Sequence, residues 1–200
     1  MCFRLQKSYW DRSKKAKRLS SWGQIARRIR VPLGFASAVL YFWLAHPSLM
    51  AMAAGGAFVA AGLSLRALAS GHVRKNEALA TSGPYAYTRN PLYLGSMLIA
   101  AGFAVAARSW WVGLIFVGML LAIYLPVIRA EEEFLRGKFP EFEEYARGVP
   151  RLLPRVRAPA MKTRSMFSTA LYLQHREYNA LLGAAGMMSA LVVKLIYFSR

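Results

Sequence analysis

The chain has 200 residues, of which 56% are hydrophobic, and this share is larger than a water-soluble core of that size requires. Its formal net charge is +18, but the basic residues lie in blocks between apolar runs and not on one face of a soluble fold. These features disfavour a soluble or nucleic-acid-binding protein and favour a membrane protein whose basic residues contact anionic lipid headgroups.

The chain begins with a basic arm, residues 1–30, and continues with a long uncharged segment. The arm holds ten Lys and Arg residues and no cleavable apolar core, so it lacks the pattern of a secretory signal. Residues 31–65 hold no charge, and His46-Pro47 interrupts them where a helix would have to break. This pattern predicts a hairpin of two membrane helices, each a little short of the roughly 20 residues that cross a bilayer.

Three more apolar segments follow along the chain. Pro91–Ala107 and residues 109–128 form a second predicted pair joined around Arg108, and the last segment runs from Tyr178 to Phe198. We therefore predict an all-α, polytopic membrane bundle of about five transmembrane helices with cytoplasmic amphipathic helices.

The basic residues predict the orientation of this bundle. Lys and Arg number 10 in residues 1–30, 4 in residues 66–90 and 10 in residues 129–177, whereas the turns near His46 and Arg108 hold 0 and 1. By the positive-inside rule, the three basic segments and the N-terminus face the cytoplasm and the C-terminus lies outside. Every polar motif then lies on one face of the membrane.

The stretch SGPYAYTRNPLYLG, residues 82–95, combines turn signals with polar side chains. Pro91 suits the first turn of a helix, and Thr88 or Asn90 can cap that helix. Local structure therefore explains several of these residues, and tyrosines are common at a membrane interface. Together, however, the stretch places a guanidinium, an amide and phenol rings at a helix N-terminus, where a carboxylate or a phosphate is favoured.

A second polar stretch, residues 129–154, follows the fourth predicted span. Four of its apolar residues fall at helical spacing and predict an amphipathic helix along the membrane surface: Leu135, Phe139, Phe142 and Tyr145. The three glutamates at 131–133 lie where a helix leaves the hydrocarbon, which is costly unless they are paired. Pairing with Arg89 or Arg129 and capture of a cationic ligand are both open.

The sequence lacks the motifs of several other kinds of site, among them metal sites, disulfides and nucleotide-binding loops. The three histidines are scattered and no His-Glu-x-x-His spacing occurs, so we expect no metal site. The single cysteine, Cys2, excludes an internal disulfide. The sequence has no glycine-rich dinucleotide loop, P-loop or nucleophile elbow.

His72 and Lys75 share the loop of the first motif and are interpreted as headgroup contacts, although a histidine there can also act as a base.

In this order, and separated by one hydrophobic hairpin, the two polar stretches resemble the isoprenylcysteine carboxyl methyltransferase family, whose relatives include phospholipid methyltransferases. The likeness covers about residues 60–155. The residues that match the family pattern are Leu79-Ala80, Thr81-Ser82-Gly83-Pro84-Tyr85, Arg89-Asn90-Pro91-Leu92-Tyr93-Leu94-Gly95, Glu131-Glu132 with Leu135, Phe139-Pro140 with Phe142 and Tyr145, and Val149-Pro150-Arg151-Leu152-Leu153-Pro154.

The resemblance implies a membrane enzyme that binds S-adenosylmethionine at its cytoplasmic face. The cofactor site that it implies is lined by Leu79, Ala80, Tyr85, Asn90, Pro91, Tyr93 and Glu131. This methyl donor carries a sulfonium, an ammonium and a carboxylate. Glu131 therefore suits its positive end or its ribose hydroxyls, and the helix start near Asn90 suits its negative end. Arg89 or Arg129 would orient the methyl acceptor.

Three positions depart from the family pattern. Asn90 stands where the family often has histidine, so a hydrogen-bonding role remains but a titrating one does not. Pro140 replaces a glycine in a turn. Val127 stands where the protein-modifying members place a substrate-binding arginine, four residues before the cofactor glutamate, and this weakens the expectation of a prenylated protein as substrate.

From these observations we predict a methyltransferase domain at 31–155, followed at 156–200 by a basic linker and an additional C-terminal transmembrane helix. The lipophilic acceptor would enter from the bilayer. Because no strong general base is evident, we favour O-methylation of an isoprenylcysteine-like carboxylate. One alternative is N-methylation of a phospholipid amine, with His72 or a glutamate of 131–133 as the base. Another is a non-catalytic membrane protein whose basic arms dock anionic lipid or nucleic acid.

Overall fold

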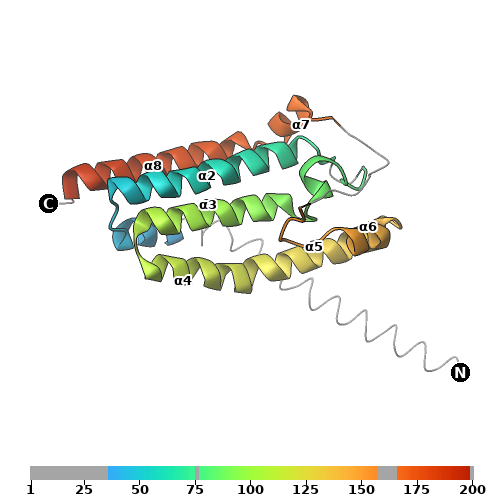
Figure 1. Ribbon diagram of the computed structural model, residues 1–200, viewed down its shortest axis with the longest axis horizontal. Coiled ribbons are helices and arrows are strands. Elements are labelled where there is room, and N and C mark those ends of the chain that lie inside the picture. Colours follow the sequence, from blue (N-terminus) through green and yellow to red (C-terminus); the bar gives the residue numbers. More distant parts are fainter. Residues whose placement is uncertain (1–35, 75–76, 157–165, 199–200) are drawn as a thin grey trace, which may run out of the picture.

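The computed structural model describes residues 36–74, 77–156 and 166–198, and within them the protein is all-helical (Figure 1). The elements after the helical residues 36–44 are α2 (Leu49–Ser70), the 3₁₀ turn η1 (Gly83–Ala86), α3 (Pro91–Ala107), α4 (Trp110–Met119), the π-helical turn η2 (Leu120–Tyr124), α5 (Leu125–Lys138), α6 (Phe142–Gly148), α7 (Thr169–Gln174) and α8 (Tyr178–Phe198). The predicted arm at 1–30 and Lys75 lie outside the described residues.

The first predicted hairpin breaks at His46-Pro47 as expected. The helical residues 36–44 end there and α2 begins at Leu49, capped by the side chain of Ser48, which accepts a hydrogen bond of 3.4 Å from the Ala51 backbone. The His46 backbone donates to the Ala107 carbonyl at 2.7 Å, so this turn lies beside the end of α3.

Helices α2 and α3 pack closely because glycines of one helix face glycines of the other. A Cβ atom placed on Gly62 would lie 2.6 Å from the Gly95 carbonyl oxygen, and one on Gly102 would lie 2.5 Å from the Gly55 carbonyl oxygen. Within a membrane, small residues of this kind let two helix backbones approach. The beginning of α3, where the first polar motif lies, is thereby fixed against α2.

The fourth span continues beyond its predicted end at Ile128. Helices α4 and α5 follow nearly one line in Figure 1 and are joined by the π-turn η2. Pro126 lies just after this turn, and its ring would clash with a carbonyl one turn earlier in a regular α-helix. The wider π-turn accommodates the proline, so the helix carries the acidic residues 131–133 out of the apolar region.

The predicted amphipathic helix is two helices and not one. Helix α5 ends at Lys138, and α6 begins only at Phe142 after a turn at Phe139-Pro140. Because α5 extends the fourth span, the prediction that this segment begins a separate helix on the membrane surface was wrong. The apolar stripe still forms one buried cluster, made of Phe142, Tyr145 and Val149 with Leu79, Leu135, Phe139 and Ala146 packed against it.

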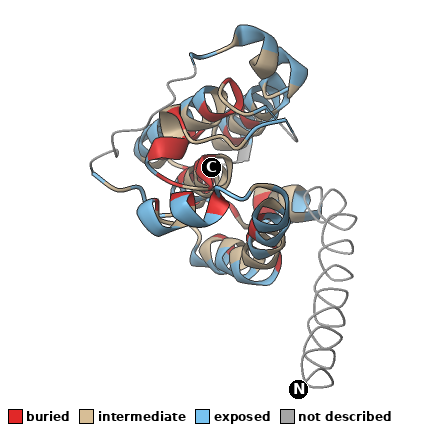
Figure 2. Ribbon diagram, turned by 90° about the vertical axis from the view of Figure 1, so that its right-hand side faces the viewer, coloured by how far each residue is buried: buried red, intermediate tan, exposed pale blue. Residues whose placement is uncertain are grey.

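The outer surfaces of the long helices are apolar, as expected of helices surrounded by lipid. Among the described residues, Leu49–Ser70, Trp110–Lys138 and Tyr178–Tyr197 are long and apolar enough to cross a membrane, and Pro91–Ala107 is a shorter apolar helix. Buried residues lie on the inward faces of the bundle (Figure 2), while side chains such as Met50, 85% exposed, point outward. The protein is therefore an all-α membrane bundle, with the first predicted span described only from residue 36.

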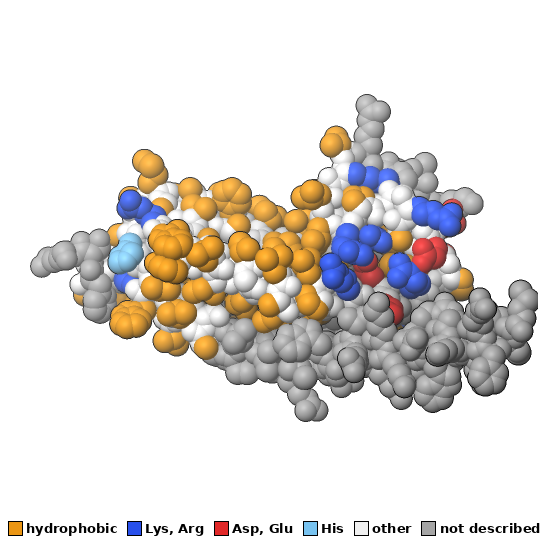
Figure 3. Space-filling model, turned by 90° about the horizontal axis from the view of Figure 1, so that it is seen from below, with side chains coloured by type: hydrophobic (Ala, Val, Ile, Leu, Met, Phe, Trp, Pro, Cys, Tyr) orange, Lys and Arg blue, Asp and Glu red, His pale blue; other side chains and the backbone are white. Residues whose placement is uncertain are grey.

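Charged side chains gather at one end of this bundle. Figure 3 shows one face on which hydrophobic residues cover most of the length and Lys, Arg, Asp and Glu cluster together. The same end holds η1, α6 and α7 in Figure 1. We call it the polar end, and both polar motifs meet there.

Candidate functional site

The two motifs are joined by an extended strap, residues 149–156, that crosses the loop before α3. The Arg89 backbone donates to the Pro150 carbonyl at 2.9 Å, and the Arg155 backbone donates to the Tyr87 carbonyl at 3.1 Å. The Thr88 hydroxyl lies 3.2 Å and 3.0 Å from the carbonyl oxygens of Arg151 and Leu152. Pro150 and Pro154 favour the extended backbone that makes these contacts.

Glu132 is the buried centre of the polar end, with 3% of its surface exposed. Its carboxylate accepts hydrogen bonds from Arg151 Nε at 3.0 Å and from Asn90 Nδ2 at 3.1 Å, and it lies 3.5 Å from Arg89 Nε. A buried carboxylate is tolerated only with such partners. Of the two explanations left open for the acidic run, pairing within the protein therefore holds for Glu132.

Asn90 precedes α3, but its side chain does not cap the helix. The amide donates instead to Glu132 and to the Arg151 carbonyl, at 3.1 Å and 3.0 Å. The Thr88 hydroxyl accepts from the Asn90 backbone at 3.4 Å. Asn90 thus connects the start of α3 to α5 and to the strap, and a neutral histidine could not donate both of these hydrogen bonds.

Glu131 lies next to this network but on an exposed face of α5. Its carboxylate accepts a hydrogen bond of 2.8 Å from the Tyr93 hydroxyl, which connects α3 and α5 a second time. The two neighbouring glutamates therefore differ in role. The Glu132 carboxylate is engaged by hydrogen bonds and ion pairs within the protein. The Glu131 carboxylate lies at the surface of a cavity.

This polar cavity has a volume of about 180 Å³ and lies between the loop before α3 and helices α5 and α6. It brings together all seven residues predicted to bind the cofactor, and Arg89 with them: Leu79, Ala80, Tyr85, Arg89, Asn90, Pro91, Tyr93 and Glu131. Arg89 Nε is buried and has no hydrogen-bond partner among the described residues. Arg129, in contrast, is exposed and lines neither this cavity nor the apolar one described below.

Two buried tyrosines form the floor of the polar cavity. The Tyr145 hydroxyl donates to the Tyr85 carbonyl at 2.8 Å, which fixes α6 to η1. Burial, together with the nearby Glu131 carboxylate, raises the pKa of Tyr85, and burial also raises the pKa of Tyr145. Both phenols therefore keep their protons at neutral pH and cannot serve as bases.

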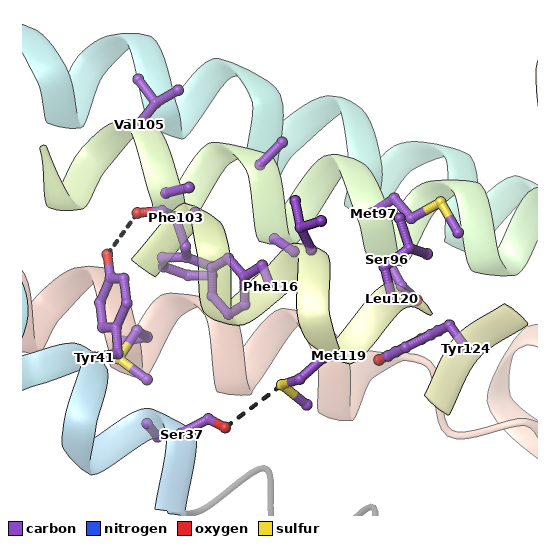
Figure 4. A pocket seen from close by; sticks show the side chains of 17 residues that line it. Ser37, Tyr41, Ser96, Met97, Phe103, Val105, Phe116, Met119, Leu120 and Tyr124 are labelled. Atoms are coloured by element: carbon purple, nitrogen blue, oxygen red, sulfur yellow. Dashed lines mark hydrogen bonds between the residues drawn. The ribbon is translucent and has the colours of Figure 1, made fainter. Parts of the chain in front are cut away.

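A larger apolar cavity of about 600 Å³ lies deeper between the helices (Figure 4). Its walls come from residues 36–44, α3, α4 and η2, together with Met187 of α8, and include Tyr41, Ser96, Phe103, Phe116 and Tyr124. At one end, the Tyr41 hydroxyl donates to the Phe103 carbonyl at 3.0 Å. At the other end lies Tyr124, whose ring meets the ring of Tyr93 edge-on at 6.1 Å between centroids.

The Tyr93–Tyr124 pair places the two cavities next to each other. Tyr93 lines the polar cavity and Tyr124 lines the apolar one. The two cavities are thus neighbours, with the contacting rings of Tyr93 and Tyr124 between them.

His72 is not part of either cavity lining. Its Nδ1 lies 2.8 Å from the Leu68 carbonyl oxygen, and its ring lies against Gly83, where a Cβ would come within 2.6 Å of a ring carbon. Gly83 has a φ of 58°, so the turn there favours glycine for its backbone as well. Within the described residues, no group of three or more His, Cys, Asp or Glu could hold a metal ion.

The ion pair of the buried Glu132 with Arg151 was not predicted from the sequence, in which Arg89 and Arg129 were the expected partners of the acidic run. Both residues of this pair belong to motifs that were recognised. Glu132 and Arg151 lie 19 positions apart in the sequence, and a contact over that separation produces no periodic pattern from which it could be predicted.

Comparison with known proteins supports the reading of the motifs. A family model described as phospholipid methyltransferase matches residues 29–141. The chain is 42% identical over 83 residues to the cobalt-zinc-cadmium resistance protein CzcN of Cupriavidus metallidurans. It is 35% identical over 103 residues to the nickel-cobalt-cadmium resistance protein NccN of Alcaligenes xylosoxydans xylosoxydans. It is also 31% identical over 99 residues to protein-S-isoprenylcysteine O-methyltransferase of Schizosaccharomyces pombe.

Each of these alignments covers only part of this chain and part of the relative. They span 42%, 51% and 49% of this chain and 38%, 45% and 42% of the respective relatives, so each covers less than half of the relative's length. No solved structure matches the chain.

Proposed function

Because the chain belongs to the phospholipid methyltransferase family, we propose that it transfers a methyl group from S-adenosylmethionine to the carboxylate of a lipophilic, isoprenylcysteine-like acceptor. The observation that carries this proposal is the meeting of the polar and apolar cavities at Tyr93 and Tyr124. A lipophilic acceptor needs such a pair of spaces, one for its tail and one for its reacting head.

The residues of the polar cavity fit the chemistry of the methyl donor. Glu131 and the Tyr93 hydroxyl offer partners for an ammonium or for ribose hydroxyls, and the ring of Tyr85 offers a face to a sulfonium. The apolar side chains Leu79 and Phe134 suit a purine ring. At about 180 Å³, the cavity is smaller than the roughly 300–1,000 Å³ of pockets that enclose small ligands. Part of the donor would therefore lie outside it, along the exposed side of Glu131, or neighbouring side chains would move.

When bound, S-adenosylmethionine supplies the methyl group: an acceptor oxygen bonds to the methyl carbon, the carbon–sulfur bond breaks, and its electron pair stays on sulfur to leave S-adenosylhomocysteine. The protein's own part is to position the acceptor and to exclude water. Arg89 lines the polar cavity with its Nε ion-paired to Glu132 at 3.5 Å, and we assign the rest of its guanidinium to hold the acceptor carboxylate.

The same geometry favours O-methylation over N-methylation. A carboxylate is ready to react at neutral pH, whereas an ammonium must first lose a proton. His72, one of the two bases considered for an amine acceptor, lies outside the polar cavity, and the phenols of Tyr85 and Tyr145 keep their protons. Of the 131–133 glutamates, Glu132 is engaged by two arginines and Glu133 does not line the cavity, while Glu131 is the residue that we assign to the donor.

The first test of this proposal is cofactor binding. Glu131→Ala is expected to weaken the binding of S-adenosylhomocysteine by about tenfold or more, because a hydrogen bond to a charged group is worth about 1.5–3 kcal/mol. Isothermal calorimetry of the detergent-purified protein measures this change. Glu133→Ala is the matched control, since Glu133 is exposed, lies two residues away and does not line the cavity. No binding by the unmodified protein, or equal binding by Glu131→Ala, would contradict the proposal.

The second test identifies the acceptor. Donor labelled in its methyl group is offered to the purified protein with a total lipid extract or with an S-farnesylcysteine analogue. We expect label in the farnesylcysteine product that base releases as methanol, since an ester is hydrolysed and an N-methylamine is not. Base-stable label in the phospholipid fraction would instead show amine methylation.

A further inference from the structure

Helix α8 lies outside the family-matched region, which ends at residue 141, yet it forms part of the apolar cavity. Met187 lines that cavity, and Ala184 and Leu191 belong to the same buried cluster as Tyr41 and Phe103. The helix is thus more than a separate anchor in the membrane. It supplies a wall of the space that the proposed function assigns to the acceptor's tail.

The polar end of α8 is held by an ion pair with α2. Arg66 and Glu177 lie 2.7 Å apart between Nη2 and Oε2, and their side chains are only 22% and 12% exposed. Arg66 Nε adds a hydrogen bond of 3.0 Å to the same carboxylate, and Arg66 Nη1 donates to the Ser96 hydroxyl at 2.5 Å. Ser96 lines the apolar cavity, so this pair connects α8, α2 and the cavity wall on α3.

The opposite end of α8 is held by Lys194. Its ammonium donates to the Trp43 carbonyl at 3.2 Å and also to the Phe42 carbonyl. These are among the last carbonyls of the helical residues 36–44, where a cation is favourable. With both of its ends fixed, α8 has a defined position against the cavity.

Met187 lies at the deep end of the cavity. It follows Glu177 by ten residues, which is about 15 Å along a helix from the level of the polar end. It lines the cavity and packs against the cluster that contains Tyr41 and Phe103, and Figure 4 shows these two residues at the end of the cavity away from Tyr124. We propose that α8 closes the deep end of the acceptor cavity and that Met187 sets the length of the apolar chain that the acceptor can carry. This inference rests on the proposed function for the identity of the cavity's occupant.

The proposal predicts opposite shifts for smaller and larger residues at this position. Met187→Ala should move the preferred chain length in a series of N-acetyl-S-alkylcysteines towards longer chains, and Met187→Trp should move it towards shorter ones. Each methylene that gains or loses its place in the cavity changes the preference by about fourfold, given about 0.8 kcal/mol per buried methylene. Leu182→Ala, on an exposed face of the same helix, is the control and should change nothing. Unchanged S-adenosylhomocysteine binding in all variants shows that they are folded. An unmoved optimum in both Met187 variants would overturn the inference.

A labelling experiment separates this inference from the proposed reaction. Because Cys2 is the only cysteine in the sequence, Met187→Cys in a Cys2→Ser background carries a single thiol. We expect the longer S-alkylcysteines to slow alkylation of this thiol by N-ethylmaleimide at least threefold, and to leave a thiol at Leu182→Cys unaffected. Protection without any methyl transfer would support the cavity and contradict the reaction. Methyl transfer without protection or a shifted optimum would support the reaction and overturn the role of α8.

Discussion

Glu132→Ala is expected to unfold the polar end, with a loss of about 3–5 kcal/mol, because it leaves buried positive charge without its counter-charge. Arg89, with a side chain 13% exposed, would lose its carboxylate partner, and the Asn90 amide would lose an acceptor. The strap would also lose its ion pair through Arg151. The expected result is a thermal midpoint well below that of the unmodified protein and no binding of S-adenosylhomocysteine.

The control for this experiment is the neighbouring glutamate, Glu131, and the two variants are compared in thermal midpoint and in cofactor binding. Glu131→Ala should weaken cofactor binding by about tenfold or more with little change in thermal midpoint, since its carboxylate is exposed, whereas Glu132→Ala should lose both binding and stability. Arg151→Ala should be milder than Glu132→Ala, because Arg151 is 44% exposed and solvent can replace part of the ion pair. A Glu132→Ala protein as heat-stable as the unmodified one would show that this network does not hold the two motifs together.

Gly62→Val is expected to have a large effect within the membrane part of the protein. A Cβ at this position would lie 2.6 Å from the Gly95 carbonyl oxygen and 2.9 Å from the Ile99 backbone nitrogen, and neither backbone atom can move without its helix. Overpacking of this kind typically costs about 1–3 kcal/mol, and a valine adds two methyl groups to the clash. Detergent-solubilised protein should show a lower thermal midpoint.

The effect of Gly62→Val should reach the polar end through α3. Arg66, one turn further along α2, donates to the Leu92 carbonyl and to Ser96, so a displaced α3 shifts the helix that carries Tyr93. Weaker binding of S-adenosylhomocysteine should therefore accompany the loss of stability. Gly118→Ala is the matched control, because no neighbouring atom lies within 4 Å of a Cβ there, and it should be neutral or slightly stabilising. Equal behaviour of the two variants would disprove the close glycine contact.

Those elements whose signals lie within a few neighbouring residues could be predicted from the sequence. The break at His46-Pro47 was correct because proline stops a helix locally, and α3 and α8 have the predicted bounds because turn residues flank uninterrupted apolar runs. The resemblance to a known family located the residues of the polar cavity, and the structure brings those seven residues together. Their role in binding a cofactor stays a prediction.

The features that depend on distant partners could not be predicted. One break was open to prediction: the apolar periodicity of 135–145 is compatible with one helix or with two, but Pro140 within it is a local signal for the turn between α5 and α6. Pro126 suggests a helix end, and only the π-turn before it explains how the helix continues. The side chains of Asn90 and Glu132 meet across 42 positions, a separation that no local pattern reports. The local pattern named Thr88 or Asn90 as a cap of α3, whereas the Asn90 side chain makes these distant contacts instead.

The π-turn η2 determines where a residue could be deleted from this long helix, and the amino-acid composition alone does not reveal this. A helix with such a turn holds one more residue than a regular helix of similar rise. Loss of one residue between 120 and 124 that restored regular winding would leave the later residues at nearly the same angle about the helix axis, whereas loss of one residue from the regular helix of α4 or early α5 would rotate them by about 100°. Glu131 would then point away from Tyr93, and Glu132 away from Asn90. We therefore expect related sequences to differ in length, if at all, within 120–124 and to keep the number of residues in the regular helix on either side.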